Sequence, residues 1–423
     1  MGNEVELSTV ITDIAAGPFG SNLKVECFVP SGFPIIDGAN LKGYKVTDNI
    51  TKFVTEEKAR SLSRSIAHRG DVIVTISGTI GQIAYIPEDS LYDEYLCSQR
   101  QFRVSFDSSM VYVPYLVFYF HTFEGQNKIL SFANQTGVPA LSQPLKNFKK
   151  IRLCLPSLQE QRRIASIVET LNDKIENNIK INDNLEQQAV QLFRSWFSNF
   201  SQSQNVKRQD SEFGEIPSTF TVVKVGSIPM LVTDYVANGS FASLKENVTL
   251  YQEPNYAYFV RNTDLKSGSF GVYVDQHSYK FLSKSTLFGG EIIISNVGDV
   301  GSVFLCPKLD GPMTLGNNII MLRPENDDLR YYLYIWFKHL QGQALIQGIK
   351  GGSAQPKFNK TDFKNTSVLL PPLDLLSRFH ETVAPMFEAI SHNQAENKRL
   401  SDLRDALLPQ LMSGEIDISD IDL

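Results

Sequence analysis

Leu155-Pro156-Ser157-Leu158-Gln159-Glu160-Gln161-Arg162-Arg163-Ile164 opens a glycine-free segment that runs to Phe200 and decides the fold. Beyond this opening, seam residues recur at alternating steps of four and three, the 3.5-residue period of a coiled coil. The seam consists of Ile164, Val168, Leu171, Ile175, Asn178, Asn182, Leu185, Ala189, Leu192 and Trp196. We therefore predict one long helix over residues 157–200, with its seam buried against a partner helix.

The same pattern returns near the end of the chain. Leu370-Pro371 repeats Leu155-Pro156 at an offset of 215 residues, and a second glycine-free segment covers residues 372–413. At that offset its seam is Phe379, Val383, Met386, Ile390, Asn393, Asn397, Leu400, Arg404, Leu407 and Leu411. We expect the two segments to pack against each other as a helix pair.

Two asparagines lie in the middle of each seam. Polar seam residues cost stability and are best explained as residues that fix the register of the pair. An antiparallel pair places Asn178 opposite Asn397 and Asn182 opposite Asn393. A parallel pair also places asparagine on asparagine, so the seam alone leaves the direction open. From Ile164 to Trp196 the helix would measure about 48 Å, more than one DNA turn of about 34 Å.

A second repeat precedes each helix. Gly70-Asp71-Val72-Ile73-Val74 matches Gly290-Glu291-Ile292-Ile293-Ile294 at an offset of 220, and Gly78 and Gly81 match Gly298 and Gly301. Each copy predicts a β-hairpin with a glycine turn, followed by an aromatic helix at 114–122 and at 328–340. The chain is therefore predicted to be a domain and a helix, repeated once.

The predicted boundaries follow from these repeats. They are 1–156 for the first domain, 157–200 for the central helix, 201–371 for the second domain, 372–413 for the C-terminal helix and 414–423 for an acidic tail. The fold class is α+β, with two mixed α/β domains separated by two long antiparallel coiled-coil helices and related by a pseudo-two-fold internal repeat.

The distribution of charge and the spacing of cysteines limit which classes of function are compatible with the sequence. The chain has a net charge of −6, but residues 1–155 are neutral, 156–200 carry −1, 201–370 carry +1, and 371–423 carry −6. The two domains are therefore free to present basic faces. The 4 cysteines and 6 histidines are scattered without metal-ligand spacing, so no metal or disulfide framework is expected. No apolar run reaches membrane-spanning length and the N-terminus lacks a signal sequence, which places the protein in the cytoplasm.

In its order of motifs the chain resembles the DNA-specificity subunits of Type I restriction–modification systems. The resemblance rests on the segments above, on Gly17-Pro18-Phe19-Gly20-Ser21-Asn22-Leu23-Lys24, and on Gly214-Glu215-Ile216-Pro217, Thr314-Leu315-Gly316-Asn317-Asn318 and Leu369-Leu370-Pro371-Pro372-Leu373. It implies two target-recognition domains that read the halves of an asymmetric, interrupted site in double-stranded DNA. It also implies a helix pair that docks two adenine-methyltransferase subunits, with nuclease–translocase subunits completing the complex.

Candidate DNA contacts are basic and amide side chains in loops, because Lys and Arg bind phosphates and Arg, Asn and Gln read base edges. In the first domain they form four groups: Arg60, Arg64 and Arg69 with His68; Gln99, Arg100 and Gln101 with Arg103; Asn134 and Gln135 followed by Lys146 and Lys149; and Ser21, Asn22 and Lys24. In the second domain they are Lys245, Arg261, Asn262, Asn296, Asn317, Asn318, Ser353, Gln355 and Lys357. Any one of these residues is more often a solvated side chain or a turn former than a DNA contact.

No catalytic signature stands out in the sequence. It contains no phosphate-binding loop with a Gly-Lys-Ser/Thr ending and no Asn/Asp-Pro-Pro-Tyr/Phe tetrad of an amino-methyltransferase. We therefore expect a non-enzymatic specificity subunit that binds no cofactor itself, with S-adenosylmethionine, ATP and Mg on the partner subunits. Two alternatives remain open: a coiled-coil scaffold that binds proteins without reading DNA, and a restriction enzyme with an unrecognised catalytic motif.

Overall fold

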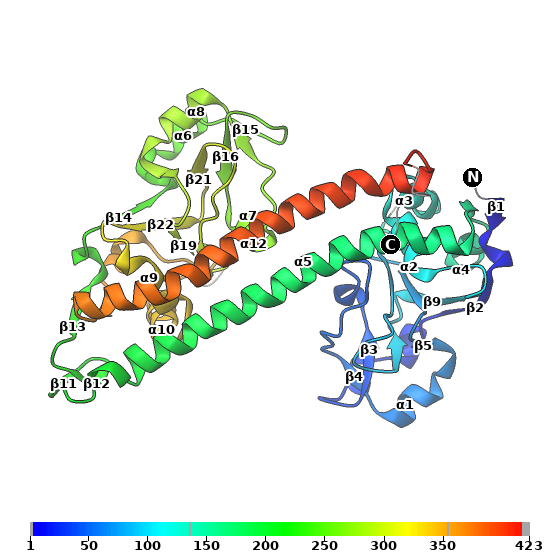
Figure 1. Ribbon diagram of the computed structural model, residues 1–423, viewed down its shortest axis with the longest axis horizontal. Coiled ribbons are helices and arrows are strands. Elements are labelled where there is room, and N and C mark those ends of the chain that lie inside the picture. The colour runs from blue at the N-terminus through cyan, green and yellow to red at the C-terminus, as the bar shows by residue number, and fades with distance from the viewer. Residues whose placement is uncertain (1–2, 135–136, 353–354, 417–423) are drawn as a thin grey trace. The chain divides into compact units, whose positions relative to one another are not determined.

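The computed structural model describes residues 3–134, 137–352 and 355–416, and Figure 1 labels many of its elements. The chain divides into two compact units. Unit 1 contains Met1–Glu176 and Asn397–Leu423, and unit 2 contains Asn177–Glu396. Each unit therefore holds one globular domain together with a part of each long helix.

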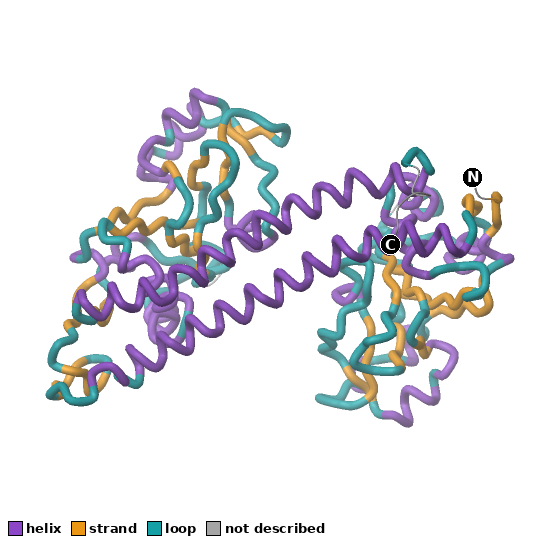
Figure 2. The backbone as a smooth tube through the Cα atoms, viewed as in Figure 1, coloured by secondary structure: helices purple, strands orange, loops and turns teal. Residues whose placement is uncertain are grey.

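Two long helices dominate the secondary structure (Figure 2). Helix α5 spans Leu158–Phe193 and continues into a π-helical turn at Arg194–Ser198, and helix α12 spans Leu373–Ser413. The start of α5 is fixed by Gln161, which is fully buried, accepts a hydrogen bond from the Tyr112 amide and donates to the carbonyls of Met110 and Pro156. The opening motif of the first repeat thus secures the helix to its own domain.

The two helices run antiparallel within each unit. In unit 1, Nη1 of Arg404 donates to Oδ1 of Asn172 (2.9 Å), and Nδ2 of Asn397 donates to the carbonyl of Ile175 (3.5 Å). In unit 2, Nδ2 of Asn393 donates to Oδ1 of Asn182 (2.8 Å). Residue numbers on α12 fall as those on α5 rise, which confirms the predicted antiparallel direction.

The apolar parts of the seam belong to the cores of the domains. Ile164, Ala165 and Val168 of α5 and Leu408 and Leu411 of α12 are part of the unit 1 core. In unit 2 the core includes Ala189, Val190, Phe193 and Phe197 together with Leu375, Leu376, Phe379, Val383 and Phe387. Each domain therefore packs directly on a stretch of both helices, and burial of these side chains drives that packing.

The first domain is built on two four-stranded sheets. One has the order β2-β9-β6-β7, formed by Ile11–Ala16, Gln101–Phe106, Val72–Thr75 and Ile83–Tyr85. The other has the order β4-β3-β8-β5, formed by Phe53–Val54, Phe33–Ile36, Glu94–Cys97 and Ile66–His68. The predicted hairpin is confirmed as β6–β7, and the aromatic helix is α2 (Val113–His121).

The second domain repeats this plan. Its four-stranded sheet has the order β14-β22-β19-β20, formed by Met230–Asp234, Ile319–Pro324, Ile292–Ser295 and Val303–Leu305. Its other sheet has the order β15-β17-β16-β21-β18, formed by Leu250–Tyr251, Tyr273–Val274, Ala257–Val260, Met313–Leu315 and Thr286–Leu287. The hairpin β19–β20 and the aromatic helix α9 (Asp328–Lys338) are again as predicted.

Membrane insertion of a helix finds no support in the structure. Among the described residues, no helix is both long and apolar enough to cross a bilayer.

Candidate nucleic-acid interface

Three loops of the first domain are gathered by backbone hydrogen bonds. The turn after β6 receives the loop between β8 and β9, because the Ile76 amide donates to the carbonyl of Arg100 (2.7 Å). The same turn meets the segment before α4 (Pro144–Lys149), because the Gly78 amide donates to the carbonyl of Pro139 (2.9 Å). We call these three loops the first loop cluster, residues 76–81, 98–100 and 133–141 without 135–136.

The second domain repeats the gathering with equivalent bonds. The Asn296 amide donates to the carbonyl of Asn318 (3.1 Å), and the Gly298 amide donates to the carbonyl of Pro356 (2.9 Å). Asn318 has a φ of +64°, a left-handed conformation that asparagine tolerates better than most residues. The second loop cluster, residues 296–301, 316–318 and 351–357 without 353–354, is thus formed by the corresponding loops.

Many of the predicted contacts of the first domain lie in or beside its loop cluster. Gln99 and Arg100 are exposed at the turn between β8 and β9, and Asn134 is exposed in the third loop. The loop that carries Ser21, Asn22 and Lys24 adjoins this turn, because a Cβ on Gly20 would stand 2.7 Å from Oε1 of Gln99. Lys146 and Lys149 are exposed on α4, which directly follows the third loop, and Gln135 lies outside the described residues.

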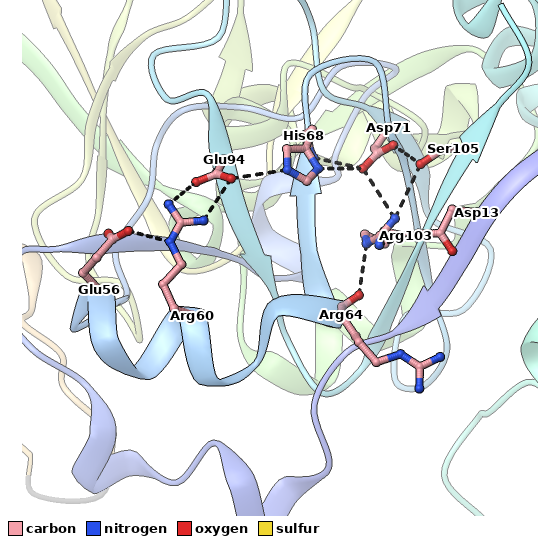
Figure 3. Close-up of polar contacts among 9 residues, drawn as sticks. All are labelled: Asp13, Glu56, Arg60, Arg64, His68, Asp71, Glu94, Arg103 and Ser105. Carbon is pink, nitrogen blue, oxygen red and sulfur yellow. Dashed lines mark hydrogen bonds and ion pairs between the residues drawn. The ribbon is translucent and has the colours of Figure 1, made fainter.

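A different environment surrounds the predicted group Arg60, Arg64 and Arg69, of which Figure 3 shows Arg60 and Arg64. Arg60 on α1 (Glu56–Ser61) bonds to Glu56 (2.8 Å) and to both carboxylate oxygens of Glu94. The hydrogen bond from Arg60 is the largest factor that lowers the pKa of Glu94. Arg69 lies 3.0 Å from Asp93 and donates to the carbonyl of Ser90. Arg60 and Arg69 are therefore already neutralised within the domain, whereas Arg64 is exposed.

Gln101 and Arg103 are misplaced by the sequence prediction. Both lie in β9 and are buried, with exposed fractions of 0% and 8%. Gln101 accepts a hydrogen bond from Ser98, while Arg103 bonds to Asp13 (2.6 Å) and to the carbonyl of Arg64. Their position inside the sheet, rather than in the loop before it, removes them from a surface that could meet DNA.

In the second domain the cluster gathers most of the predicted residues. Asn317 and Asn318 are exposed, as are Gln355 and Lys357 in the third loop. Asn262, at the start of α7 (Asn262–Ser267), reaches the cluster by donating to Asp299 (3.4 Å). Arg261 is held by Asp264 at 2.6 Å, and Asn296 is half-buried. Lys245 is exposed on α6 (Phe241–Asn247), which packs against α8 (Gln276–Phe281), and Ser353 lies outside the described residues.

One pair of residues was missed by the sequence analysis. The acidic residues of the repeated motif, Asp71 and Glu291, are 5% and 3% exposed, and each faces an arginine of the neighbouring strand. Glu291 lies 2.8 Å from Arg323, and Asp71 lies 3.9 Å from Arg103. Arg103 and Arg323 share the offset of 220 residues with the acids, so the repeat itself held the signal.

The structure offers no evident place for a metal ion. Over residues 3–134, 137–352 and 355–416, no group of three His, Cys, Asp or Glu side chains could hold one.

Comparison with known proteins identifies the fold and the family. The family model of the Type I restriction modification DNA specificity domain matches residues 29–187 and again residues 217–395, once for each half of the repeat. The chain belongs to the Type I restriction–modification DNA specificity family. The two matches cover most of both domains and large parts of both helices, so the internal repeat is the repeat of this family.

Individual relatives are similar along most of their length. This specificity subunit is 25% identical over 419 residues to the Type I restriction enzyme MjaIX specificity subunit of Methanocaldococcus jannaschii, covering 97% of this chain and 93% of that protein. It is 22% identical to the HindI specificity subunit of Haemophilus influenzae, covering 79% and 84%. The crystal structure of the S subunit from M. genitalium shares the fold, with a TM-score of 0.55 at 14% identity, and covers 97% of this chain and 95% of that chain.

Proposed function

We propose that each recognition domain reads one half of an interrupted, asymmetric DNA site and that its loop cluster is the surface that meets the bases. The observation that carries this proposal is the repeated gathering of loops by equivalent hydrogen bonds in two different sequences. Loops held on a rigid sheet are a common place for recognition residues. In each cluster the gathered side chains are the types that read base edges or bind phosphates.

The two clusters differ at equivalent positions, which supports two different half-sites. Gln99 and Arg100 in the first domain correspond to Asn317 and Asn318 in the second, because Arg100 and Asn318 accept the equivalent backbone bonds from Ile76 and Asn296. Arginine pairs well with guanine, and asparagine and glutamine pair well with adenine. We propose that these four residues contribute to base readout, with Ser21, Asn22, Asn134, Gln355 and Lys357 beside them.

Within the complex, the helix pair is proposed to set the spacing of the half-sites and to dock two adenine-methyltransferase subunits. Helix α5 has 36 residues, a length of about 54 Å. On α5, Ile179 and Ile181 remain 49% and 48% exposed, which suits apolar contacts with partner helices. Nuclease–translocase subunits would complete the restriction complex, and we propose that the complex acts on DNA in the cytoplasm.

Catalysis is proposed to reside in the partners, which would bind S-adenosylmethionine, ATP and Mg. This specificity subunit would then neither methylate nor cleave DNA when purified alone. Methylation that appears only when methyltransferase subunits are added would support the proposal. Methylation or cleavage by the pure chain would contradict it and would favour an enzyme with an unrecognised catalytic motif.

The decisive experiment is adenine-methylation sequencing of a strain with this gene intact and with the gene deleted. We expect one interrupted, asymmetric adenine motif to disappear on deletion. If every motif persists, binding of the reconstituted complex to a random DNA library decides the question. A complex that assembles but enriches no sequence would overturn DNA readout and favour the scaffold alternative.

Individual residues are tested by variants in the reconstituted complex. Arg100→Gln should relax the sequence preference in one half-site, with a discrimination loss of about 1–3 kcal/mol at the base it contacts. Asn318→Ala should do the same in the other half-site. The matched control is Arg69→Gln, because Arg69 is engaged by Asp93 and the Ser90 carbonyl and should leave both half-sites unchanged.

A further inference from the structure

Each recognition domain contains a pair of basic residues at the same place in the repeat. The first basic residue is a strand arginine, the buried Arg103 or the half-buried Arg323, which donates to a backbone carbonyl of Arg64 (3.1 Å) or Thr286 (2.6 Å). The second lies at the centre of a short 3-10 turn, as Arg64 in Ser63–Ser65 and as Lys284 in Ser283–Ser285. The offset is again 220 residues, so the two pairs are equivalent.

In the first domain this basic pair has an acidic partner on the neighbouring strand. Asp13 on β2 accepts a hydrogen bond from Nη2 of Arg103 at 2.6 Å (Figure 3). The hydrogen bond from Arg103 is the main factor that lowers the pKa of Asp13, and the charge of Arg64 adds a smaller effect. The chain therefore supplies its own anion to Arg103.

The second domain lacks that anion. Asp13 pairs with Ser105 in the first domain, and the position that corresponds to Ser105 is Glu325, whose amide donates to the carbonyl of Pro229 (3.0 Å). Proline thus stands where the first domain has Asp13. Among the described residues, Glu291 remains as the one carboxylate paired with Arg323.

A hollow of about 360 Å³ lies beside Arg323. Its polar lining consists of Arg323, Lys284, Thr233, Thr286 and Ser283, with Phe288 and other apolar side chains completing the wall, and no Asp or Glu lines it. Among the described residues, Nζ of Lys284 and Nη1 of Arg323 have no acceptor, since Arg323 uses Nε and Nη2 for Glu291 and the Thr286 carbonyl. Two cations therefore line an open space, and among the described residues only Arg323 of the two is paired with a carboxylate.

We infer that this hollow binds a phosphate group, held by Arg323 and Lys284 and by the hydroxyls around them. Arginine and lysine are the usual phosphate ligands, and hydroxyl groups complete such sites. In the first domain the equivalent strand arginine, Arg103, binds an anionic group, because it donates a hydrogen bond to the carboxylate of Asp13. Resting on the proposed function, the expected source of the phosphate is the DNA backbone, which would make this a positioning contact without sequence information.

The first arm of the test uses inorganic phosphate and the full-length subunit. Phosphate should raise the melting temperature of the wild-type chain relative to chloride at equal ionic strength, because a ligand of the folded state stabilises it. Lys284→Gln should lose this shift. Arg64→Gln is the matched control in the first domain, where Asp13 already serves Arg103, and it should keep the shift. Pro229→Asp supplies an internal anion and should also abolish the response.

The second arm uses DNA and the complex reconstituted with methyltransferase subunits. Lys284→Gln should weaken binding of target and non-target DNA alike, and should reduce the slope of log affinity against log salt by about 0.9. Arg69→Gln serves as the comparison and should keep the wild-type salt slope, because Arg69 is engaged by Asp93 and the Ser90 carbonyl. A phosphate response with an unchanged salt slope supports the phosphate site and identifies the free ion as its ligand.

The inference is overturned if Lys284→Gln and the wild type show the same change in melting temperature with phosphate and the same slope of log affinity against log salt. Failure of the proposed function would look different. In that case the wild-type complex would show no preference for any DNA sequence, while the phosphate arm would still report on the hollow.

Discussion

At the scale of single residues, the acid of the repeated Gly-Asp or Gly-Glu motif explains why the motif recurs. Glu291 accepts hydrogen bonds from the amides of Phe288 (2.8 Å) and Gly289 (2.9 Å) while it faces Arg323. It therefore fixes the turn that precedes the hairpin and compensates the charge of the strand arginine. A buried carboxylate with several partners is costly to remove, because its partners then lose both charge compensation and hydrogen bonds.

From this geometry we predict that Glu291→Gln lowers the free energy of unfolding of unit 2 by about 2–3 kcal/mol. Asp71→Asn should cost less in unit 1, because Arg103 keeps Asp13 as a second carboxylate. Both losses of unfolding free energy can be measured by denaturant titration, with hydrogen exchange as the readout for each unit. Equal losses in the two variants would show that Asp13 does not compensate Arg103.

Acid sensitivity is predicted at His121, whose Nε2 lies 2.8 Å from the carbonyl of Ile83. Burial is the main factor that lowers the pKa of His121 below its usual 6.5. The unfolded chain therefore takes up a proton at higher pH than the folded one, so this stability is present above pH 6.5 and is lost as the pH falls below it. We expect a decline of at most about 1.4 kcal/mol per pH unit, absent in His121→Gln. Parallel pH profiles for the two proteins would contradict it.

Residue identity alone did not show which predicted side chains are free. Arg60 and Arg69 are of a residue type that often contacts DNA. They are neutralised by Glu94 and Asp93, which lie more than twenty residues away in the sequence. Gln101 follows two exposed recognition candidates but begins strand β9, where its side chain is buried. These outcomes depend on strand pairing between distant segments, which a local pattern does not contain.

At the scale of elements, the helix pair was predictable because its pattern is long and periodic. The 3.5-residue seam and its repetition indicated two helices that pack together, and the structure confirms the predicted antiparallel direction. It also shows how Arg404, a charged residue in the seam, is accommodated: it bonds to Asn172 and stacks 5.4 Å from the ring of Tyr44. The contact with Tyr44 comes from a loop of the first domain, so the pattern of seam residues does not predict it.

The central asparagines give an element-scale prediction. Asn182→Leu should destabilise unit 2 by about 1–3 kcal/mol, because Nδ2 of Asn393 loses its acceptor in a partly buried seam. Asn182→Leu combined with Asn393→Leu should recover that loss, since an apolar pair suits a seam position. A double-mutant cycle by thermal unfolding measures the coupling. If the two losses simply add, the asparagines are not coupled across the seam.

At the scale of the whole molecule, the repeat predicts that the recognition domains are interchangeable modules. Each domain packs on a stretch of both helices through its own core, and the equivalent loops are gathered by equivalent bonds. A specificity subunit in which residues 1–156 replace residues 201–371 should therefore carry two copies of the first loop cluster. Because identical clusters read identical half-sites, the methylated site should change from asymmetric to palindromic. Methylation sequencing of a host that expresses this chimera with methyltransferase subunits tests the prediction, with the wild-type subunit in the same host as control. An unchanged asymmetric motif would show that sequence readout does not reside in the exchanged domain.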